Sequence, residues 1–338
     1  MEFKTADLSD IQKAVKMSDR IFGTNLNGKS IGRRYPILYS AENKEHINVA
    51  KEGSEVCAVL NWRMVNFKSG SRVITAGCVG GVCTDEKARG KGCAGRLLEM
   101  AYSQMEQLNV ALCFISGTRG LYLRSGARLV GEEYMAEFSA PILSDGINEA
   151  SYEEIPQHID AVVRAHNRQA VRFLRSYEET KRMTEAVVCG EKEYKMLYND
   201  KAYILLFVNA DSAVLFDYSG EEEEVARLIR HGAALYKRSV SGTVNRADKR
   251  LLELADRAEK RKYYGTVKII NPELLLIQSG FCFDSLEKTE NGYIIEKDGR
   301  RIQIGEDEFY SAVFDGNNEI FANTFPLVLP DICGIDGI

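Results

Sequence analysis

The stretch that decides the fold is Val82-Cys83-Thr84-Asp85-Glu86-Lys87-Ala88-Arg89-Gly90-Lys91-Gly92-Cys93-Ala94-Gly95. An apolar, strand-like run ends near Thr84, a charged loop follows, and glycines lead into the start of a helix. The first turn of a helix carries unpaired backbone N–H groups and the positive end of the helix dipole, which together attract anions. Glycines at 90 and 92 let the backbone approach a ligand closely, because they have no Cβ. The stretch therefore predicts an anion site, and a diphosphate fits it.

The segments around this stretch predict a mixed sheet. Apolar residues recur at three- and four-residue steps over residues 94–108, which indicates a helix between strands at 73–84 and 110–116. Two strands joined by a crossover helix are parallel. Before them, an amphipathic helix over residues 7–22 precedes strand-like runs at 47–51 and 56–67, whose short connections favour antiparallel pairing. The first 140 residues are thus expected to form an α/β domain whose sheet is antiparallel first and parallel after the crossover.

Three interpretations of the glycine loop compete. Gly90-x-Gly92-x-x-Gly95 formally matches the GxGxxG pattern of dinucleotide-binding folds. In that fold the glycines follow the strand directly and the unit opens a parallel sheet, whereas here the charged residues 85–89 intervene and an antiparallel part precedes. A P-loop is excluded because no GxxxxGK[ST] occurs. A simple strand–helix turn remains a further alternative.

Arg89-x-x-Gly92-x-Ala94 resembles the (R/Q)xxGx(G/A) motif of the GCN5-related N-acetyltransferase (GNAT) superfamily, and the order of elements over residues 1–140 resembles that fold. The resemblance implies that the loop binds the pyrophosphate of acetyl-CoA. It also implies that the strands on either side of the motif helix splay apart, with the pantetheine arm along the first of them. The residues that it assigns to acetyl-CoA are Val82, Cys83, Thr84, Arg89, Gly90, Lys91, Gly92, Cys93, Ala94 and Gly95.

The segment 117–127, GTRGLYLRSGA, resembles the short helix in which many members carry a tyrosine near the coenzyme sulfur. Collapse of a tetrahedral intermediate expels a thiolate, which a nearby phenol can protonate. Tyr122 is therefore the candidate catalytic acid; a packing role is the alternative. Cys93 suggests a covalent intermediate, but the motif places it beside the phosphates, so we expect a structural role.

The three-part layout resembles the enhanced-intracellular-survival type of acetyltransferase. It implies a catalytic domain at 1–140, a degenerate GNAT-like domain at 141–262 and a short sterol-carrier-like module at 263–338. In the second domain, the position that corresponds to the glycine loop holds four glutamates at 221–224. Their negative charge would repel a diphosphate. In the resembled proteins the terminal carboxylate reaches the catalytic pocket, so the carboxylate of Ile338 is the candidate base; docking of the tail on the surface is the alternative.

Composition narrows the classes of partner. Among 338 residues, 44 Lys+Arg against 49 Asp+Glu give a net charge of -5, which offers no reason to expect nucleic acid or an anionic membrane. The four histidines are scattered and the eight cysteines include no CxxC pair, so we expect no bound metal. The cysteines are expected to be buried free thiols in a reducing compartment. The first ten residues lack the layout of a signal peptide, and no apolar run is long enough to span a bilayer. We expect a cytoplasmic protein, and the resembled three-part proteins often assemble into homo-oligomers.

The sequence thus predicts an N-acetyltransferase that moves an acetyl group from acetyl-CoA directly to a primary amine on a small molecule or peptide. The acceptor pocket should be lined by the loop Thr24–Tyr39 and by the second domain. Two alternatives stay open. One is a protein that senses acyl-CoA without catalysis, and the other is a peptidoglycan aminoacyl transferase that uses aminoacyl-tRNA.

Overall fold

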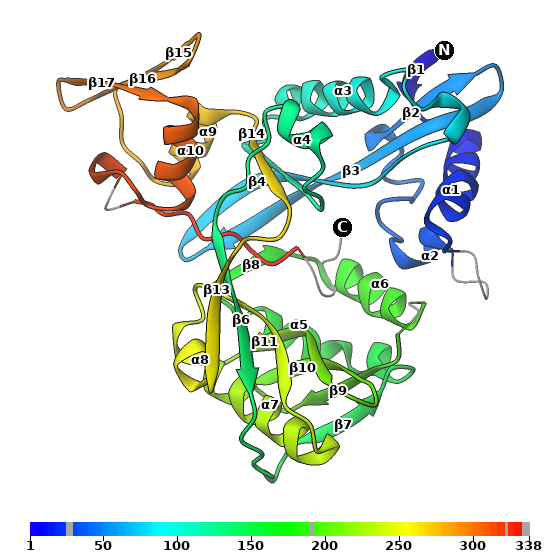
Figure 1. The fold of residues 1–338 in the computed structure, drawn as a ribbon, viewed down its shortest axis with the longest axis vertical. Helices are drawn as coiled ribbons and strands as arrows, with labels where there is room; N and C mark the ends of the chain where they lie inside the picture. The colour runs from blue at the N-terminus through cyan, green and yellow to red at the C-terminus, as the bar shows by residue number, and fades with distance from the viewer. Residues whose placement is uncertain (25–29, 190–191, 322–323, 333–338) are drawn as a thin grey trace.

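Two large sheets and one small sheet organise the chain (Figure 1). The computed structural model describes residues 1–24, 30–189, 192–321 and 324–332. In this part of the chain the two large sheets have seven strands each, and the small sheet has three. The mixed α/β fold class predicted from the sequence is confirmed.

The first sheet has the strand order β1-β2-β3-β4-β5-β14, and β8 pairs with one end of β3. Only β4 and β5 are parallel, and all other neighbours are antiparallel. The strands are β1 (Glu2–Thr5), β2 (Ile47–Glu52), β3 (Glu55–Ser69), β4 (Arg72–Thr84), β5 (Leu112–Ile115), β8 (Val171–Leu174) and β14 (Thr266–Ile269). The expected change from antiparallel to parallel pairing is therefore present at the crossover.

Helices α1 (Leu8–Phe22) and α3 (Cys93–Gln107) pack against this sheet. Helix α1 begins at a capping box, in which Asp7 accepts from the backbone of residues 9 and 10 while Asp10 accepts from the Asp7 N–H. The apolar face predicted for α3 is buried against β2, β3 and β4. Two short helices, α2 (Ile31–Arg34) and α4 (Gly120–Arg124), follow the loops at the ends of α1 and β5.

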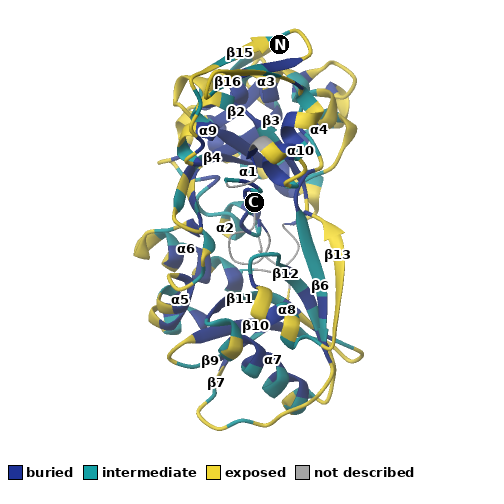
Figure 2. Ribbon diagram, turned by 90° about the vertical axis from the view of Figure 1, so that its left-hand side faces the viewer, coloured by how far each residue is buried: buried dark blue, intermediate teal, exposed yellow. Residues whose placement is uncertain are grey.

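The second sheet repeats the central arrangement of the first. Its order is β13-β6-β12-β11-β10-β9-β7, and β11 and β12 are parallel neighbours joined by helix α7 (Glu222–Tyr236), as β4 and β5 are joined by α3. The strands are β6 (Glu132–Phe138), β7 (Asn148–Ser151), β9 (Tyr194–Tyr198), β10 (Ala202–Val208), β11 (Ala213–Gly220), β12 (Val240–Asn245) and β13 (Arg257–Lys262). Helices α5 (Ile159–His166), α6 (Tyr177–Val188) and α8 (Lys249–Leu254) complete this layer. Figure 2 shows β13 exposed along its length at the edge of the sheet.

The C-terminal part packs against the first sheet. It contains helices α9 (Pro272–Gln278) and α10 (Glu306–Phe314) and the sheet β15 (Ser285–Thr289), β16 (Gly292–Lys297) and β17 (Arg300–Gly305). The tail then runs between the two large sheets (Figure 1), where Leu327 and Leu329 are buried and the Asn245 side-chain amide of β12 donates to the Leu329 carbonyl at 2.8 Å.

Two strand pairings bear on the domain boundaries proposed at 140 and 262. Strand β6 lies in the second sheet although it precedes residue 140, and β14 returns to the first sheet beside β5. Between helices α5 and α6 the chain forms the short strand β8, which pairs with β3 of the first sheet. The physical reason is a tertiary contact, because Phe173 of β8 packs edge-on against Phe67 and Phe114. Within the described residues no helix is long and apolar enough to cross a membrane.

Candidate functional site

Strands β4 and β5 separate before β4 ends and the chain enters the glycine loop. They pair only from Ala76 and Leu112 to Val79 and Ile115, while β4 continues to Thr84. On its other side β4 slips in register against β3 between Val59 and Asn61, which marks a bulge. Gly81 lies in this bulge with φ +62°, a conformation that glycine adopts without strain. The splay implied by the sequence resemblance is therefore present.

A cavity of about 350 Å³ opens at this splay. Residues 79–82 of β4 form one wall, Ser116, Gly117, Arg119 and Tyr122 form another, and the third comes from the end of α1 and the segment around α2. The residues that line it are Phe22, Thr24, Ile31, Arg34, Tyr35, Val79, Gly80, Gly81, Val82, Ser116, Gly117, Arg119 and Tyr122. A slot of this size accepts a chain-like ligand together with a small acceptor group.

The glycine loop presents a row of free backbone donors. Gly92 is the N-cap of α3 with φ +74°, and Gly90 has φ +77°. Among the described residues, none accepts a hydrogen bond from the backbone N–H groups of residues 90–95, and the first N–H of α3 that is bonded belongs to Arg96. The space where a Cβ would stand at Gly90 or Gly92 is open. Exposed amides at the positive end of a helix dipole form an anion site.

Basic side chains surround these amides. Arg89 is 60% exposed and faces Glu86 at 3.7 Å, a weak surface contact, and Lys91 is also exposed. Both can turn towards a bound diphosphate without leaving a buried partner unpaired. The loop therefore has the charge and the donors that a diphosphate requires.

The predicted coenzyme residues on β4 have different surroundings. Val82 lines the cavity, whereas the Cys83 side chain is buried on the opposite face of the strand, with its sulfur 3.4 Å from the Ser18 hydroxyl. Burial raises the pKa of Cys83 to about 11, so this thiol stays protonated near neutral pH. Thr84 pairs with Ala58 at the end of the strand. Cys83 can therefore offer a ligand only its backbone.

The remaining predicted residues of the motif lie in the first turn of α3. Cys93 is 2% exposed, and its sulfur lies 3.7 Å from the Ala88 carbonyl and 3.1 Å from the Met1 sulfur. Ala94 and Gly95 follow, and the side chain nearest to Gly95 is Leu121. The buried Cys93 thiol has the surroundings of a packing residue and not those of an exposed nucleophile.

Tyr122 projects from α4 to the cavity wall. Its ring packs on the backbone of Gly117, where a Cβ would lie only 2.8 Å from Cε2. No described residue forms a hydrogen bond with its hydroxyl, and burial raises the pKa of this phenol above its ordinary value. Tyr122 thus keeps its proton at neutral pH and has no fixed recipient for it. The other predicted catalytic residue, Ile338, lies outside the described residues.

Sequence reasoning missed the group that positions the cavity wall formed by Thr24 and the segment around α2. Asp19, buried near the end of α1, accepts hydrogen bonds from the Thr24 hydroxyl at 2.8 Å, the Ser30 hydroxyl at 2.8 Å and the Ile31 N–H at 2.6 Å. It therefore fixes both ends of the segment that leads to α2, within the loop Thr24–Tyr39 that was expected to line the acceptor pocket. A single aspartate in the last turn of an amphipathic helix carries no signal of such a role.

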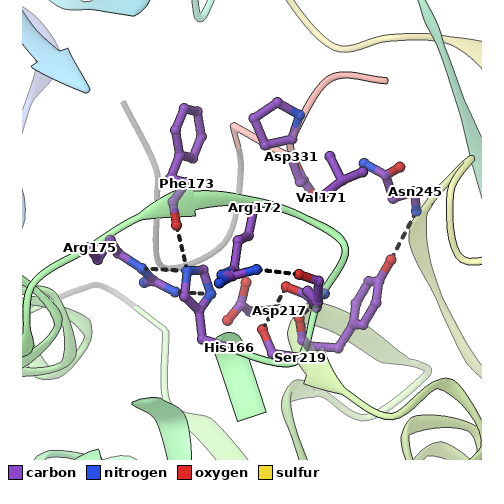
Figure 3. A pocket seen from close by; sticks show the side chains of 12 residues that line it. His166, Val171, Arg172, Phe173, Arg175, Asp217, Ser219, Asn245 and Asp331 are labelled. Carbon is purple, nitrogen blue, oxygen red and sulfur yellow. Dashed lines mark hydrogen bonds between the residues drawn. The ribbon is translucent and has the colours of Figure 1, made fainter. Parts of the chain in front are cut away.

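Side chains occupy most of the corresponding gap in the second sheet (Figure 3). Strands β11 and β12 pair only from Ala213 and Val240 to Leu215 and Gly242. Beyond that point Asp217 accepts from the Tyr203 hydroxyl at 2.6 Å, and the Ser219 hydroxyl donates to the Gln169 side-chain oxygen at 3.0 Å.

Two further contacts close this gap. The Nε2 atom of His166 lies 2.7 Å from the Phe173 carbonyl, and the Arg175 guanidinium contacts both ring nitrogens of His166. The cavity that remains is about 30 Å³, against about 350 Å³ in the first sheet. In addition, residues 222–224 place three glutamates in the first turn of α7, where the first sheet has its glycine loop. Among the described residues, the second sheet thus has neither the large cavity nor the glycine loop of the first.

Comparisons with known proteins agree with this geometry. Residues 2–130 match the model of a family described as acetyltransferase (GNAT) domain. No curated protein matches the chain.

Several solved structures share the fold over most of the chain. Eis1 from Mycobacterium abscessus is 12% identical, with a TM-score of 0.66 over 94% of this chain and 90% of that one. A GCN5-related N-acetyltransferase from Kribbella flavida is 14% identical, with a TM-score of 0.62 over 89% and 82% of the two chains. Another from Anabaena variabilis is 11% identical, with a TM-score of 0.60 over 90% and 85%. At these identities the likeness concerns the fold, and it extends through all three parts.

Proposed function

The N-terminal part of this chain belongs to the GNAT superfamily of acetyltransferases, and from that premise we propose that the protein transfers an acetyl group from acetyl-CoA to a primary amine. The proposal rests on one observation: the cavity wall on β4 and the free backbone amides after it follow one another along the chain. The strand lines the cavity with residues 79–82, and the chain then reaches the row of free amides at 90–95. A ligand with a diphosphate at one end and a reactive group at the end of a flexible arm matches this arrangement.

The residues present fit such a coenzyme. The amides of residues 90–95 and the side chains of Arg89 and Lys91 would hold the diphosphate. The part of β4 beyond Val79 has backbone groups that do not pair with β5, and these would bind the polar atoms of the pantetheine arm. Acetyl-CoA, when bound, supplies an acyl thioester. Gly81 leaves room at the bulge for the Tyr39 hydroxyl, which a side chain at this position would meet.

The chemistry then depends on few groups of this chain. The cavity holds the acceptor amine against the thioester and raises its effective concentration. A backbone amide of β4 polarises the carbonyl as negative charge develops on its oxygen. Tyr122 holds a proton on Oη and gives it to the departing sulfur. Because burial raises the pKa of Tyr122, the phenol carries that proton throughout the neutral range.

Calorimetric titration of acetyl-CoA into wild type and an Arg89→Ala, Gly92→Asp double variant tests the coenzyme site. The aspartate would add negative charge to the amide row, and the first change removes a cation. We expect micromolar binding by wild type and none by the variant. A matched control is Arg72→Ala, Gly70→Asp, which makes the same changes in the β3–β4 turn, where Gly70 also has positive φ and open space.

The control variant should bind acetyl-CoA as wild type does. A well-folded wild type that does not bind acetyl-CoA would refute the acetyltransferase proposal. Binding without turnover of any amine would instead favour an acyl-CoA sensor.

A further inference from the structure

Arg63 on β3 is a buried cation without a partner. Its side chain is only 6% exposed and faces a small cavity beside the one described above. Among the described residues, none forms a hydrogen bond or an ion pair with its guanidinium. The cavity is lined by Arg34, Tyr35, Pro36, Ile37 and Leu38, by Arg63, and by Met183 and Ala186 of α6.

An arginine in this position has guanidinium donors that an anion can satisfy. The guanidinium stays charged in proteins, and removing it from water costs several kcal/mol unless a hydrogen-bonded counter-charge replaces the solvent. The residues that line the cavity include two arginines and no acid. Glu42, an acid near α6, lies 3.6 Å from Arg182 instead. Among the residues that the structure describes around this cavity, none therefore offers Arg63 a carboxylate, and an anionic group of a ligand would fit there.

The size of this cavity indicates which part of a ligand it takes. Its volume is about 30 Å³, roughly the room for two water-sized groups. That is enough for one carboxylate and too little for a whole substrate. A planar carboxylate also matches the fork of an arginine, which binds both of its oxygens at once.

The small cavity adjoins the large one. Arg34 and Tyr35 line both of them, so the two cavities are separated by no more than this pair of residues. Tyr122 and the splayed end of β4 line only the large cavity. An acceptor with its amine in the large cavity would thus place a group a few atoms away next to Arg63.

We propose that the acceptor is an amine that also carries a carboxylate, an amino acid or a short peptide, and that Arg63 binds this carboxylate. The proposal rests on the proposed function for the transfer itself. In that step a bond forms between the amine nitrogen and the acyl carbon, and the carbon–sulfur bond breaks. The sulfur leaves as a thiol with the proton from Tyr122, and the proton that the amine nitrogen loses returns through solvent to the Tyr122 oxygen. The carboxylate takes no part in the chemistry and only orients the acceptor.

The test uses acceptors that differ only in the anionic group. The panel consists of the common amino acids, β-alanine and γ-aminobutyrate, each paired with the amine that lacks the carboxylate, such as L-lysine with cadaverine. O-phosphoethanolamine paired with ethanolamine represents phosphate. The full-length wild type is compared with Arg63→Gln, with Arg63→Lys and with the control Arg72→Gln on the same sheet.

We expect carboxylate-bearing amines to have the higher kcat/KM. Loss of a charge-assisted bidentate contact should lower kcat/KM for them about tenfold or more in Arg63→Gln, with little change for their decarboxylated partners. Arg63→Lys should retain part of the preference because it keeps the charge, and Arg72→Gln should behave as wild type. Equal use of both members of each pair, a preference for phosphate alone, or an unchanged preference in Arg63→Gln would overturn the proposal.

A second measurement separates this proposal from the proposed function. The same panel is titrated by calorimetry into wild type and Arg63→Gln without any coenzyme. Carboxylate-dependent binding that Arg63→Gln abolishes supports the site even if acetyl-CoA does not bind. Carboxylate binding that is absent, or equal in the two proteins, refutes the site even if acetyl-CoA binds and other amines are acetylated.

Discussion

Replacing Tyr122 by phenylalanine separates catalysis from stability. The ring of Tyr122 is buried on Gly117, and phenylalanine preserves that packing. No described residue bonds to the hydroxyl, so its removal should change the free energy of unfolding by less than about 1 kcal/mol. If the hydroxyl protonates the leaving sulfur, turnover should fall about 100-fold or more, since general acid catalysis contributes at least that factor. A 100-fold loss corresponds to about 2.7 kcal/mol in the barrier.

The assay measures thiol release from acetyl-CoA with an acceptor amine, alongside urea unfolding and acetyl-CoA titration. Tyr102→Phe is the matched control, because Tyr102 is also a buried tyrosine of the same core but shares a hydrogen bond with the Ser125 hydroxyl at 2.9 Å. That variant should lose about 1 kcal/mol of stability and keep its turnover. The two tyrosines are thus expected to show opposite effects.

The pH profile provides a second measurement. Since burial raises the pKa of Tyr122, the phenol holds its proton up to a pH above the ordinary tyrosine value of 10. Any alkaline decline in turnover that depends on Tyr122 should therefore lie above pH 10. Unchanged turnover in Tyr122→Phe, or a Tyr122-dependent decline near pH 8, would refute the assignment of this residue as the acid.

Three further predictions concern other parts of the chain. Gly81→Ala would place Cβ 2.5 Å from the Tyr39 hydroxyl at a φ of +62°. Urea unfolding should show that this variant loses about 3 kcal/mol of unfolding free energy. The control Gly70→Ala, whose left-handed position is open, should lose about 1 kcal/mol. Burial raises the pKa of Asp248 to about 7, so the native state holds a proton there that the unfolded chain releases near pH 3.8. As the pH rises from about 4 to 7, wild type should therefore lose stability relative to Asp248→Asn, by about 4 kcal/mol at most. If the urea midpoints of the two proteins shift in parallel across this range, the raised pKa of Asp248 is wrong. Cys93→Ser should keep its activity in the transfer assay because the thiol is a packing group, and an inactive but folded variant would reopen a covalent mechanism.

The parts of the fold that local sequence specifies could be predicted. The glycines before α3, the apolar face of that helix and the short connections between β2, β3 and β4 all act over a few residues, and each element forms where it was expected. Strand β8 could not be recognised, because only the distant aromatic partners of Phe173 favour a strand over a helix there. The return of β14 to β5 is likewise a pairing across more than 140 residues, which no local pattern encodes.

The candidate site was likewise predictable from the sequence only in part. The motif loop and Tyr122 follow from short motifs, and the structure brings β4, the loop and α4 together around one cavity. The assignment of acetyl-CoA to these residues stays a prediction. Arg63 could not be found, because a single arginine within an apolar strand has the same pattern whether it faces solvent or a closed cavity. Its role depends on α2 and α6, which approach it only in the folded chain.

The position of β14 has a consequence for how the protein is made. During synthesis residues 1–138 leave the ribosome first, yet the open edge of β5 is covered only by residues 266–269. Until then the backbone groups of Leu112–Ile115 on that side have no strand partner, which is a condition that favours aggregation. A shortened chain that ends at residue 130, where the family match ends, would keep this edge permanently. We therefore expect a chain that ends before Ile269 to aggregate more readily on expression than the full chain does.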